Sequence, residues 1–234
     1  MVVIGRMKKL VIQIYSFFFK LANIFQRNSF KTKGSLFFLV KIQGKKNNII
    51  SFKKALIKRS VITLNGKNNT ITIQGNTYNT NILLVGNNNK LKIHENVQVH
   101  NTHIIIRGNN CSIEINKDTT FGSSYIVCMG INNFINIGED CMFADNVEIW
   151  NTDSHPIFNS TGNIINVSTP IQIGNHVWCG KNSTILKGVS IGEHSIIGMQ
   201  TLVTKDIKAH TLNVGIPSRA IKENVNWNRN FITK

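Results

Sequence analysis

Apolar residues return at a fixed spacing along most of this chain. After residue 172 the spacing is six positions without interruption, through Ile173, Cys179, Ile185, Ile191, Ile197 and Val203. Small or aliphatic residues follow four positions later, at Val177, Ser183, Val189, Ser195 and Thr201. Earlier runs keep the same spacing: Ile93, Val99, Ile105; Ile115, Phe121, Val127; and Ile137, Phe143, Ile149. This pattern predicts flat six-residue faces, each placing one side chain inward.

The six-residue spacing lies within a longer repeat. A Gly/Asn motif recurs at Gly44, Gly66, Gly86, Gly108 and Gly130, in steps of 22, 20, 22 and 22 residues. A fixed period in this range is typical of a solenoid. Three six-residue faces use 18 residues, and the other four form a corner where Asn and Gly adopt the left-handed backbone conformation at low cost. A right-handed β-helix also accommodates 22-residue coils, but the six-residue sub-period favours the left-handed form.

These patterns predict an all-β protein, a left-handed parallel β-helix over residues 44–207. Residues 1–43 are expected to cap it, with a helix over 1–30 and an apolar strand over 34–43, and residues 208–234 to form a C-terminal tail. The six-residue spacing stops once, over residues 152–170, although Ile149 and Ile173 remain in phase, 24 residues apart. A loop inserted without a phase shift is expected to project from the wall, and loops on rigid scaffolds often carry function.

Charge is distributed unevenly along the 234 residues. The formal net charge is +16, and no Asp or Glu precedes Glu95. Such a balance favours an anionic partner: nucleic acid, an anionic membrane surface or an acidic polymer. A genome biased toward Lys and Asn codons would give the same composition.

The apolar run at residues 11–19 is shorter than the ~20 residues that span a bilayer, and no small-residue cleavage site follows it. It suits a helix lying on a membrane surface or one packed on the scaffold end, and both alternatives stay open. We therefore expect a cytoplasmic protein, with peripheral contact at the inner membrane face. The four cysteines form no CxxC pair and are expected to be buried, reduced thiols.

Several motifs carry a resemblance to a known family. They are the His155-Pro156 step, the stretch Ile-Gly-Asn-His-Val-Trp-Cys-Gly over residues 173–180, Ile197-Gly198-Met199, Val203-Thr204-Lys205-Asp206 and Gly215-Ile216-Pro217-Ser218-Arg219. With these, the chain resembles the hexapeptide-repeat acyltransferases over residues 130–222. More narrowly it is similar to the galactoside- and maltose-type sugar O-acetyltransferases, and to enzymes that O-acetylate capsule or lipopolysaccharide sugars, polysialic acid included. Met199 stands where many relatives carry Ala, and Lys181 where some carry Ser.

The resemblance implies a homotrimer with active sites between neighbouring prisms and acetyl-CoA along the C-terminal coils. Moving an acetyl group from a thioester to a hydroxyl requires a base, and histidine suits because its ordinary pKa is ~6.5. His155 is the candidate base, and Asp153 the candidate that holds its ring; the alternatives are a surface-loop histidine and a turn-forming aspartate. Trp178 is a bulky aromatic residue within a run of aliphatic and small residues, so its indole is expected to point outward. There it would line the acetyl or acceptor pocket; the alternative is an aromatic side chain packed at an interface.

The cofactor's phosphates require cations. Where the resemblance places the nucleotide, the sequence offers Lys205, Arg219 and Lys222, with Thr204 as a hydroxyl contact; a solvated charged tail is the alternative. Backbone N–H groups at Gly180 and Lys181 are candidates for the oxyanion of the tetrahedral intermediate. Trp178 and Met199 complete the expected cofactor contacts.

The sequence thus predicts an acetyl-CoA-dependent O-acetyltransferase acting on a sugar hydroxyl, with a bacterial capsule or other surface polysaccharide, sialic acid included, as acceptor. No metal and no nucleic acid are expected. Three alternatives stay open: an N-acetyltransferase of an amino sugar, a zinc enzyme similar to the γ-class carbonic anhydrases, and a polysaccharide-binding β-helix without catalysis.

Overall fold

The computed structural model describes residues 28–44 and 47–233. In this part of the chain every regular element is a β-strand, and no helix is long and apolar enough to cross a bilayer. The helix expected over residues 1–30 lies almost entirely outside the described residues.

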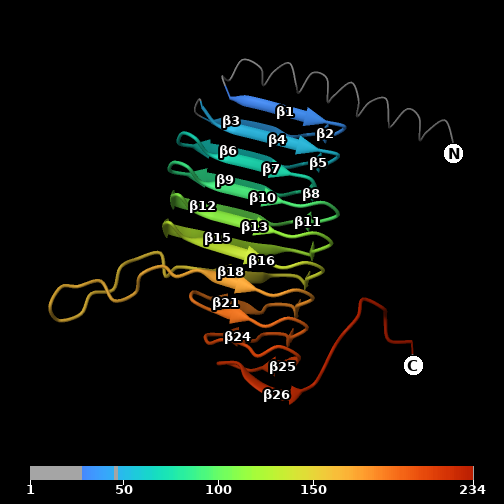
Figure 1. Cartoon of the computed structure of the whole chain (residues 1–234), viewed down its shortest axis with the longest axis vertical. Coiled ribbons are helices and arrows are strands. Elements are labelled where there is room, and N and C mark those ends of the chain that lie inside the picture. The colour runs from blue at the N-terminus through green and yellow to red at the C-terminus, as the bar shows by residue number, and fades with distance from the viewer. Residues whose placement is uncertain (1–27, 45–46, 234) are drawn as a thin grey trace.

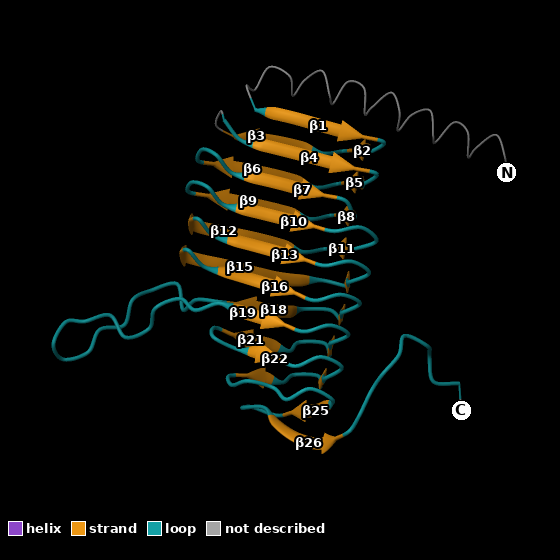
Figure 2. Cartoon of the chain, in the orientation of Figure 1, coloured by secondary structure: helices purple, strands orange, loops and turns teal. Residues whose placement is uncertain are grey.

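The strands form three parallel sheets that build the walls of a solenoid (Figure 1, Figure 2). Sheet A contains β1 Ser29–Lys33, β4 Ile49–Lys53, β7 Thr70–Ile73, β10 Lys90–Ile93, β13 Ser112–Ile115, β16 Phe134–Ile137, β19 Ile171–Ile173 and β22 Ser190–Ile191. Sheet B contains β2 Leu36–Phe38, β5 Leu56–Lys58, β8 Asn76–Tyr78, β11 Gln98–His100, β14 Thr120–Phe121, β17 Met142–Phe143, β20 Trp178–Cys179, β23 Ile196–Ile197, β25 Thr211–Val214 and β26 Arg219–Glu223. Sheet C contains β3 Lys41–Gly44, β6 Val61–Asn65, β9 Asn81–Val85, β12 His103–Asn109, β15 Ser124–Ile131, β18 Val147–Trp150, β21 Thr184–Leu186 and β24 Leu202–Val203.

The solenoid is left-handed. In Figure 1 the strands of sheet A run from left to right at the front and those of sheet C return at the back, while the chain descends from the N-terminal end. The winding is therefore counter-clockwise as the chain recedes from a viewer at that end. The left-handed parallel β-helix predicted from the six-residue spacing is confirmed.

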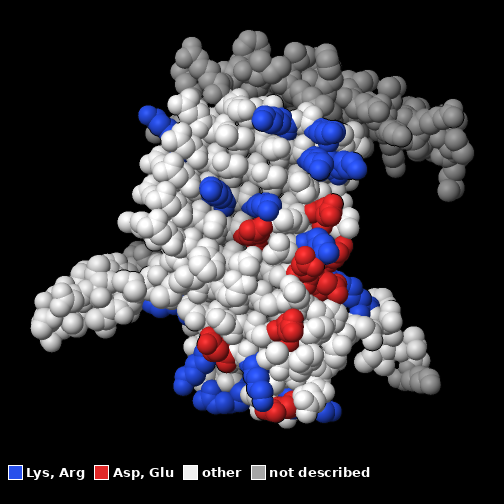
Figure 3. All heavy atoms as spheres, viewed as in Figure 1, with Lys and Arg blue, Asp and Glu red and all other residues white. Residues whose placement is uncertain are grey.

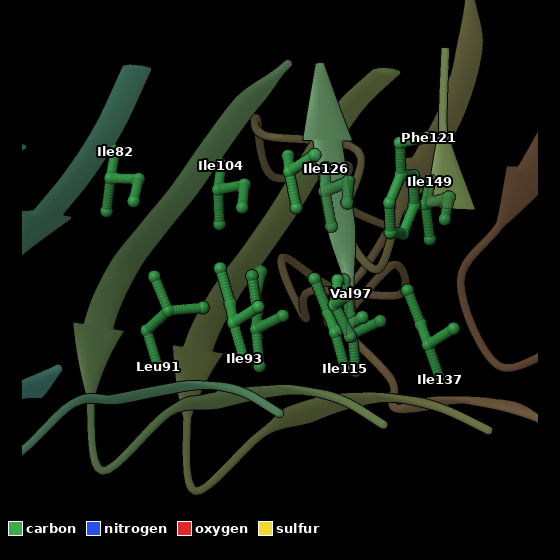
Figure 4. Packing of buried hydrophobic residues seen from close by; sticks show 14 of the residues in the cluster. Ile82, Leu91, Ile93, Val97, Ile104, Ile115, Phe121, Ile126, Ile137 and Ile149 are labelled. Carbon is green, nitrogen blue, oxygen red and sulfur yellow. The ribbon is translucent and has the colours of Figure 1, made fainter. Parts of the chain in front are cut away.

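Inward side chains stack from coil to coil and fill the prism (Figure 4). In sheet A, register pairs Ile93 with Ile115, Ile115 with Ile137, and Ile137 with Ile173. All of the predicted hexad positions from Ile173 to Val203 are at most 3% exposed. The four cysteines are buried and free, as expected, and burial raises the pKa of the Cys141 thiol to about 11.

Two predicted inward positions are wrong, Ile105 and Val127, which pair in register on β12 and β15; Val127 is 1% exposed but lies outside the core cluster. Ile105 is only partly buried, while Ile104 and Ile106 on either side of it are 0% exposed. Strict alternation along β12 places Ile104 and Ile106 inward, and Ile104 follows the inward Val99 by five residues, so the corner before this strand is one residue shorter than the six-residue spacing requires. A six-residue spacing counted from Val99 therefore falls on Ile105, the outward position between Ile104 and Ile106.

The Asn-rich corner between sheets C and A is stabilised by a ladder of buried asparagines. The side-chain oxygen of Asn69 accepts the backbone N–H of Asn89 at 2.9 Å, and the oxygen of Asn89 accepts the N–H of Cys111 at 3.0 Å. The Asn89 amide donates to the Gly108 carbonyl at 2.8 Å. Each asparagine therefore satisfies backbone groups of the next coil, which explains the recurring Gly/Asn motif.

The described coils begin earlier than residue 44. Strands β1, β2 and β3 already form one full coil, and β1 pairs with β4 in parallel over five residues. The single strand expected over 34–43 is divided, because Leu39 has a positive φ of 51° and turns the chain between β2 and β3. A continuous apolar run gives no sign of such a corner. At the other end, within the predicted tail, β25 adds to β23 in parallel and β26 folds back antiparallel on β25.

Candidate functional site

Residues 152–170 leave the wall between β18 and β19 as a hairpin arm. Its two sides are joined by an antiparallel bridge between Phe158 and Ile164 and by a 2.9 Å bond from the Ile165 N–H to the Ile157 carbonyl. Figure 1 shows the arm projecting far from the prism. Below it β19 pairs directly with β16, so the arm is inserted without shifting the coils.

His155 lies at the base of this arm. Its side chain is exposed and lines a cavity of ≈ 470 Å³ that also includes Asn133, Ser154 and Asn166. Its backbone is held on both sides, because its N–H donates to the Asp153 carbonyl at 2.8 Å and its carbonyl accepts from the Asn166 amide at 2.8 Å. Within the described residues the imidazole itself makes no hydrogen bond, so it is available to a ligand entering the cavity.

The carboxylate of Asp153 is directed away from the ring that it was expected to hold. It accepts hydrogen bonds from the Lys187 ammonium and, at 2.9 Å, from the Asn166 amide. These bonds, that from Lys187 first, hold the pKa of Asp153 below its ordinary value. Asp153 therefore anchors the arm to the following coil, and it acts on His155 only through the backbone.

Asn166 is the residue at this base that sequence reasoning missed. Its amide donates to both Asp153 and His155, and its oxygen accepts the Ile157 N–H at 2.6 Å. One side chain thus closes the two sides of the hairpin around His155. Nothing in the sequence distinguishes this asparagine from the many others in an Asn-rich chain.

Trp178 lies on a different side of the prism. It projects from the outer face of sheet B, flanked in register by Met142 and Ile196, and is 36% exposed. The corner that carries His155 joins sheets C and A, which is the edge opposite sheet B. Within a single chain the two residues do not share a cavity.

The expected cofactor residues fall into separate groups. Gly180, Lys181 and Met199 lie at the corner between sheets B and C, and Met199 is 65% exposed. Lys205 and Thr204 follow β24 at the corner between sheets C and A, two coils below the arm. Arg219 and Lys222 lie on β26, exposed at the C-terminal end, where Figure 3 shows a gathering of basic side chains.

One of the two expected oxyanion donors is already engaged. The Gly180 N–H donates to the Ile197 carbonyl at 2.8 Å, whereas the Lys181 N–H makes no hydrogen bond within the described residues. Gly180 is also required for stacking, because a Cβ there would lie 2.7 Å from the Met199 nitrogen. Of this pair, only Lys181 offers a donor.

The outward surface of the corner between sheets A and B carries a histidine ladder. The rings of His194 and His210 stack at 4.7 Å with planes 5° apart, and those of His176 and His194 lie 5.1 Å apart. Glu193, His194 and His210 bring potential metal-ligand atoms within 4.8 Å of one another. However, nearly parallel rings direct their lone pairs side by side instead of toward one point, which is a poor fit to a tetrahedral zinc site.

Known proteins similar to this chain share its repeat and its fold. The family described as bacterial transferase hexapeptide (six repeats) matches residues 170–205. The crystal structure of the polysialic acid O-acetyltransferase OatWY superimposes with a TM-score of 0.70 at 32% identity, over 88% of this chain and 94% of that one. The chain belongs to the hexapeptide-repeat acetyltransferases.

Two further relatives support this membership and the resemblance inferred from the sequence motifs. The polysialic-acid-specific acetyltransferase NeuO gives a TM-score of 0.66 at 30% identity, over 86% of this chain and 83% of that one. The galactoside O-acetyltransferase of Escherichia coli (strain K12) is 48% identical over 56 residues, which is 24% of this chain. That match spans only 28% of the length of the Escherichia coli protein.

Proposed function

We propose that this hexapeptide-repeat acetyltransferase transfers the acetyl group of acetyl-CoA to a hydroxyl of a sugar in a bacterial capsule or other surface polysaccharide. A sialic-acid-containing acceptor is favoured, because OatWY and NeuO, which act on polysialic acid by name, align with most of this chain. The observation that carries the proposal is the placement of His155. It is the exposed titratable side chain in the cavity at the base of the one arm that leaves the described coils.

In this proposal His155 is the general base. Its imidazole takes the proton of the acceptor hydroxyl as the oxygen attacks the thioester carbonyl, and the tetrahedral intermediate then expels the CoA thiolate, which receives the proton. The Lys181 N–H is the candidate donor to the oxyanion. General-base catalysis typically contributes about 10²–10⁴-fold to the rate, so His155 is expected to account for most of the chemical step.

The working unit in this proposal is a homotrimer. His155 and Trp178 lie on opposite sides of one prism, and the expected cofactor residues are divided between its edges, so only neighbouring copies bring them together. The arm also exposes Ile157, Phe158, Ile164, Ile165 and Val167, each between 52% and 63%. A neighbouring copy would cover this apolar surface and complete the pocket with its own Trp178.

Phosphates of the cofactor would be bound by basic residues at the C-terminal end. Lys187 and Lys205 lie in successive coils below the arm, on the same edge as His155. They mark a path from the reacting thioester toward Arg219 and Lys222 on β26. The same proposal places the enzyme in the cytoplasm, where acetyl-CoA is made, with the basic first third facing an acidic glycan or the inner membrane face.

The decisive experiment follows thiol release from acetyl-CoA with a panel of acceptors: sialic acid oligomers, neutral galactosides, maltooligosaccharides and amino sugars. Mass shifts of the acceptor, with and without mild alkali, distinguish O- from N-acetylation. The variant His155→Ala should lose at least 10²-fold in kcat and keep the oligomeric state of the wild type. The matched control His100→Ala, an exposed histidine on β11, should keep full activity. Unchanged turnover in His155→Ala would remove this residue from the base role, and no transfer to any acceptor would favour a binding β-helix.

A further inference from the structure

The chain beyond β26 does not simply end; it returns along the corner between sheets A and B. The Val225 N–H donates to the His210 carbonyl, the Trp227 indole donates to the His176 carbonyl, and Arg229 reaches Asp140. His210, His176 and Asp140 are corner residues with positive φ that belong to coils progressively nearer the N-terminus. We call residues 224–230 the C-terminal strap; Figure 1 shows it rising beside the coils.

Trp227 is the central anchor of the strap. It is 8% exposed, and its ring stacks on His176 at 4.2 Å with planes 13° apart. Its indole N–H donates to the His176 carbonyl at 2.8 Å, and its own carbonyl lies 2.9 Å from His176 Nε2. Two hydrogen bonds and a stacked ring fix the position of this side chain against the corner.

The corner is shaped to receive these groups. His176 Nδ1 lies 2.7 Å from Asp140 Oδ2, so both ring nitrogens of His176 face acceptors and each must donate for both bonds to form. Arg229 adds two hydrogen bonds at this corner: its guanidinium donates to the other Asp140 oxygen at 3.0 Å and to the Thr120 hydroxyl at 2.9 Å. It also reaches the carbonyls of Asp118 and Cys141.

The strap lies beside Trp178. The rings of Trp178 and Trp227 are 6.0 Å apart and inclined at 46°. Met142 and Ile196 flank Trp178 along the axis of the solenoid, and Trp227 adds a contact that neither of them supplies. An outward indole on a flat sheet would otherwise occupy several rotamers.

A purely structural role as an end cap does not explain this arrangement. The end of the solenoid is already covered by β26, which pairs antiparallel with β25. The strap instead contacts the side of the prism, two, three and four coils above that of His210, at His176, Asp140 and Asp118. Its contacts are therefore placed where they affect the Trp178 face.

We propose that the C-terminal strap, through Trp227, is a positioning element that holds the Trp178 indole in the orientation that forms one wall of the acetyl-transfer site. This inference rests on the proposed function, which makes Trp178 part of that site. Trp227 does not touch the reacting atoms; it acts through Trp178. A pocket wall displaced by about 1 Å costs up to roughly 10²-fold in rate, so the strap should affect kcat more than the binding of either substrate.

The first measurement reports on Trp178 alone and needs no substrate. In the full chain carrying Trp150→Phe and Trp227→Phe, Trp178 is the single remaining tryptophan, and its emission and acrylamide quenching report its exposure. Adding Arg229→Ala should release the strap, shift the emission to longer wavelength and raise the quenching constant about twofold. Adding Lys208→Ala, which removes the exposed ion pair with Glu223, should change neither. Equal quenching with and without Arg229→Ala would overturn the inference, whatever the enzyme acetylates.

The second measurement uses the otherwise native chain and the acceptor found in the panel. Trp227→Ala and Arg229→Ala should lower kcat roughly tenfold or more with KM within about twofold, and Trp227→Phe, which keeps the stacked ring, should restore most of the activity. Circular dichroism and oligomeric state should match the wild type. Full activity in both variants would refute the positioning role. A wild type inactive on every acceptor would instead refute the proposed function and leave the quenching result to decide the structural part.

Discussion

Asp153 and Lys187 form an ion pair that joins the base of the hairpin arm to the next coil of the solenoid. Asp153 lies two residues from His155 in sequence, and the Lys187 ammonium also donates to the Asn166 carbonyl at 3.1 Å. The position of the catalytic candidate is thus tied to a strand of the rigid scaffold, although the arm itself projects into solvent.

Acid should release this anchor. Because the pKa of Asp153 is lowered in the folded chain, first by Lys187 and then by Asn166, its contribution to stability is present above the unfolded value of ~3.9 and is lost as pH falls through the folded value. Hydrogen exchange of residues 157–166 should therefore rise below about pH 4 before the coils unfold. The Lys187→Gln variant should show fast exchange at neutral pH, with little further change on acidification.

Removing the Asn166 side chain should loosen His155 without removing it. Asn166→Ala deletes three hydrogen bonds at the base of the arm, so we expect kcat to fall about tenfold and the arm to be cleaved faster by proteases. Asn163→Ala at the tip of the arm, where the asparagine amide only contacts Thr161, is the matched control and should keep full activity. Equal kinetics in the two variants would show that the hydrogen bonds of Asn166 do not position the base.

The buried asparagine ladder should be costly to interrupt. Asn89→Ala leaves the buried Cys111 N–H without its acceptor, at about 1–3 kcal/mol, and removes the donor to the half-buried Gly108 carbonyl. Asn87, two residues earlier, makes its hydrogen bonds at the surface, where water replaces them, so Asn87→Ala should cost less than about 1 kcal/mol. Urea unfolding of the two variants compares these free energies directly.

The aliphatic stack gives a second comparison of stability. Ile137 is 0% exposed within the sheet A column, and Ile137→Ala should lower the free energy of unfolding by about 2–5 kcal/mol. Ile131 is 70% exposed, so Ile131→Ala should change it by no more than about 0.5 kcal/mol. A small cost at Ile137 would mean that the coils collapse readily around the cavity.

Much of the scaffold could be predicted because each coil repeats the same constraint. The hexads from Ile173 to Val203 are regular, and every one of them is buried. The prediction failed where a local feature broke the count: a corner one residue shorter than the six-residue spacing moved Ile105 outward, and the turn at Leu39 divided an apolar run. Periodicity reports the average coil, and it carries no information about a corner of unusual length.

The candidate site was predictable only in part. The interruption of the hexads identified the arm that carries His155, because a phase-preserving insertion is visible in the sequence. The partners of Asp153 and the roles of Asn166 and Trp227 were not, since they depend on how the arm and the C-terminal strap fold back. Trp227 and His176 are 51 residues apart in the chain and meet only in three dimensions.

Because the arm is inserted in phase, the loop that carries His155 is structurally separate from the strand pairing that holds the coils together. Since β16 and β19 remain hydrogen-bonded as if nothing stood between them, the arm is a cassette whose length and sequence can diverge while the coils on either side keep their register. Under the proposed function, the tip of the arm, beyond the base that holds His155, can then be exchanged on an unchanged prism, and the acceptors that such variants use test whether this segment sets acceptor preference.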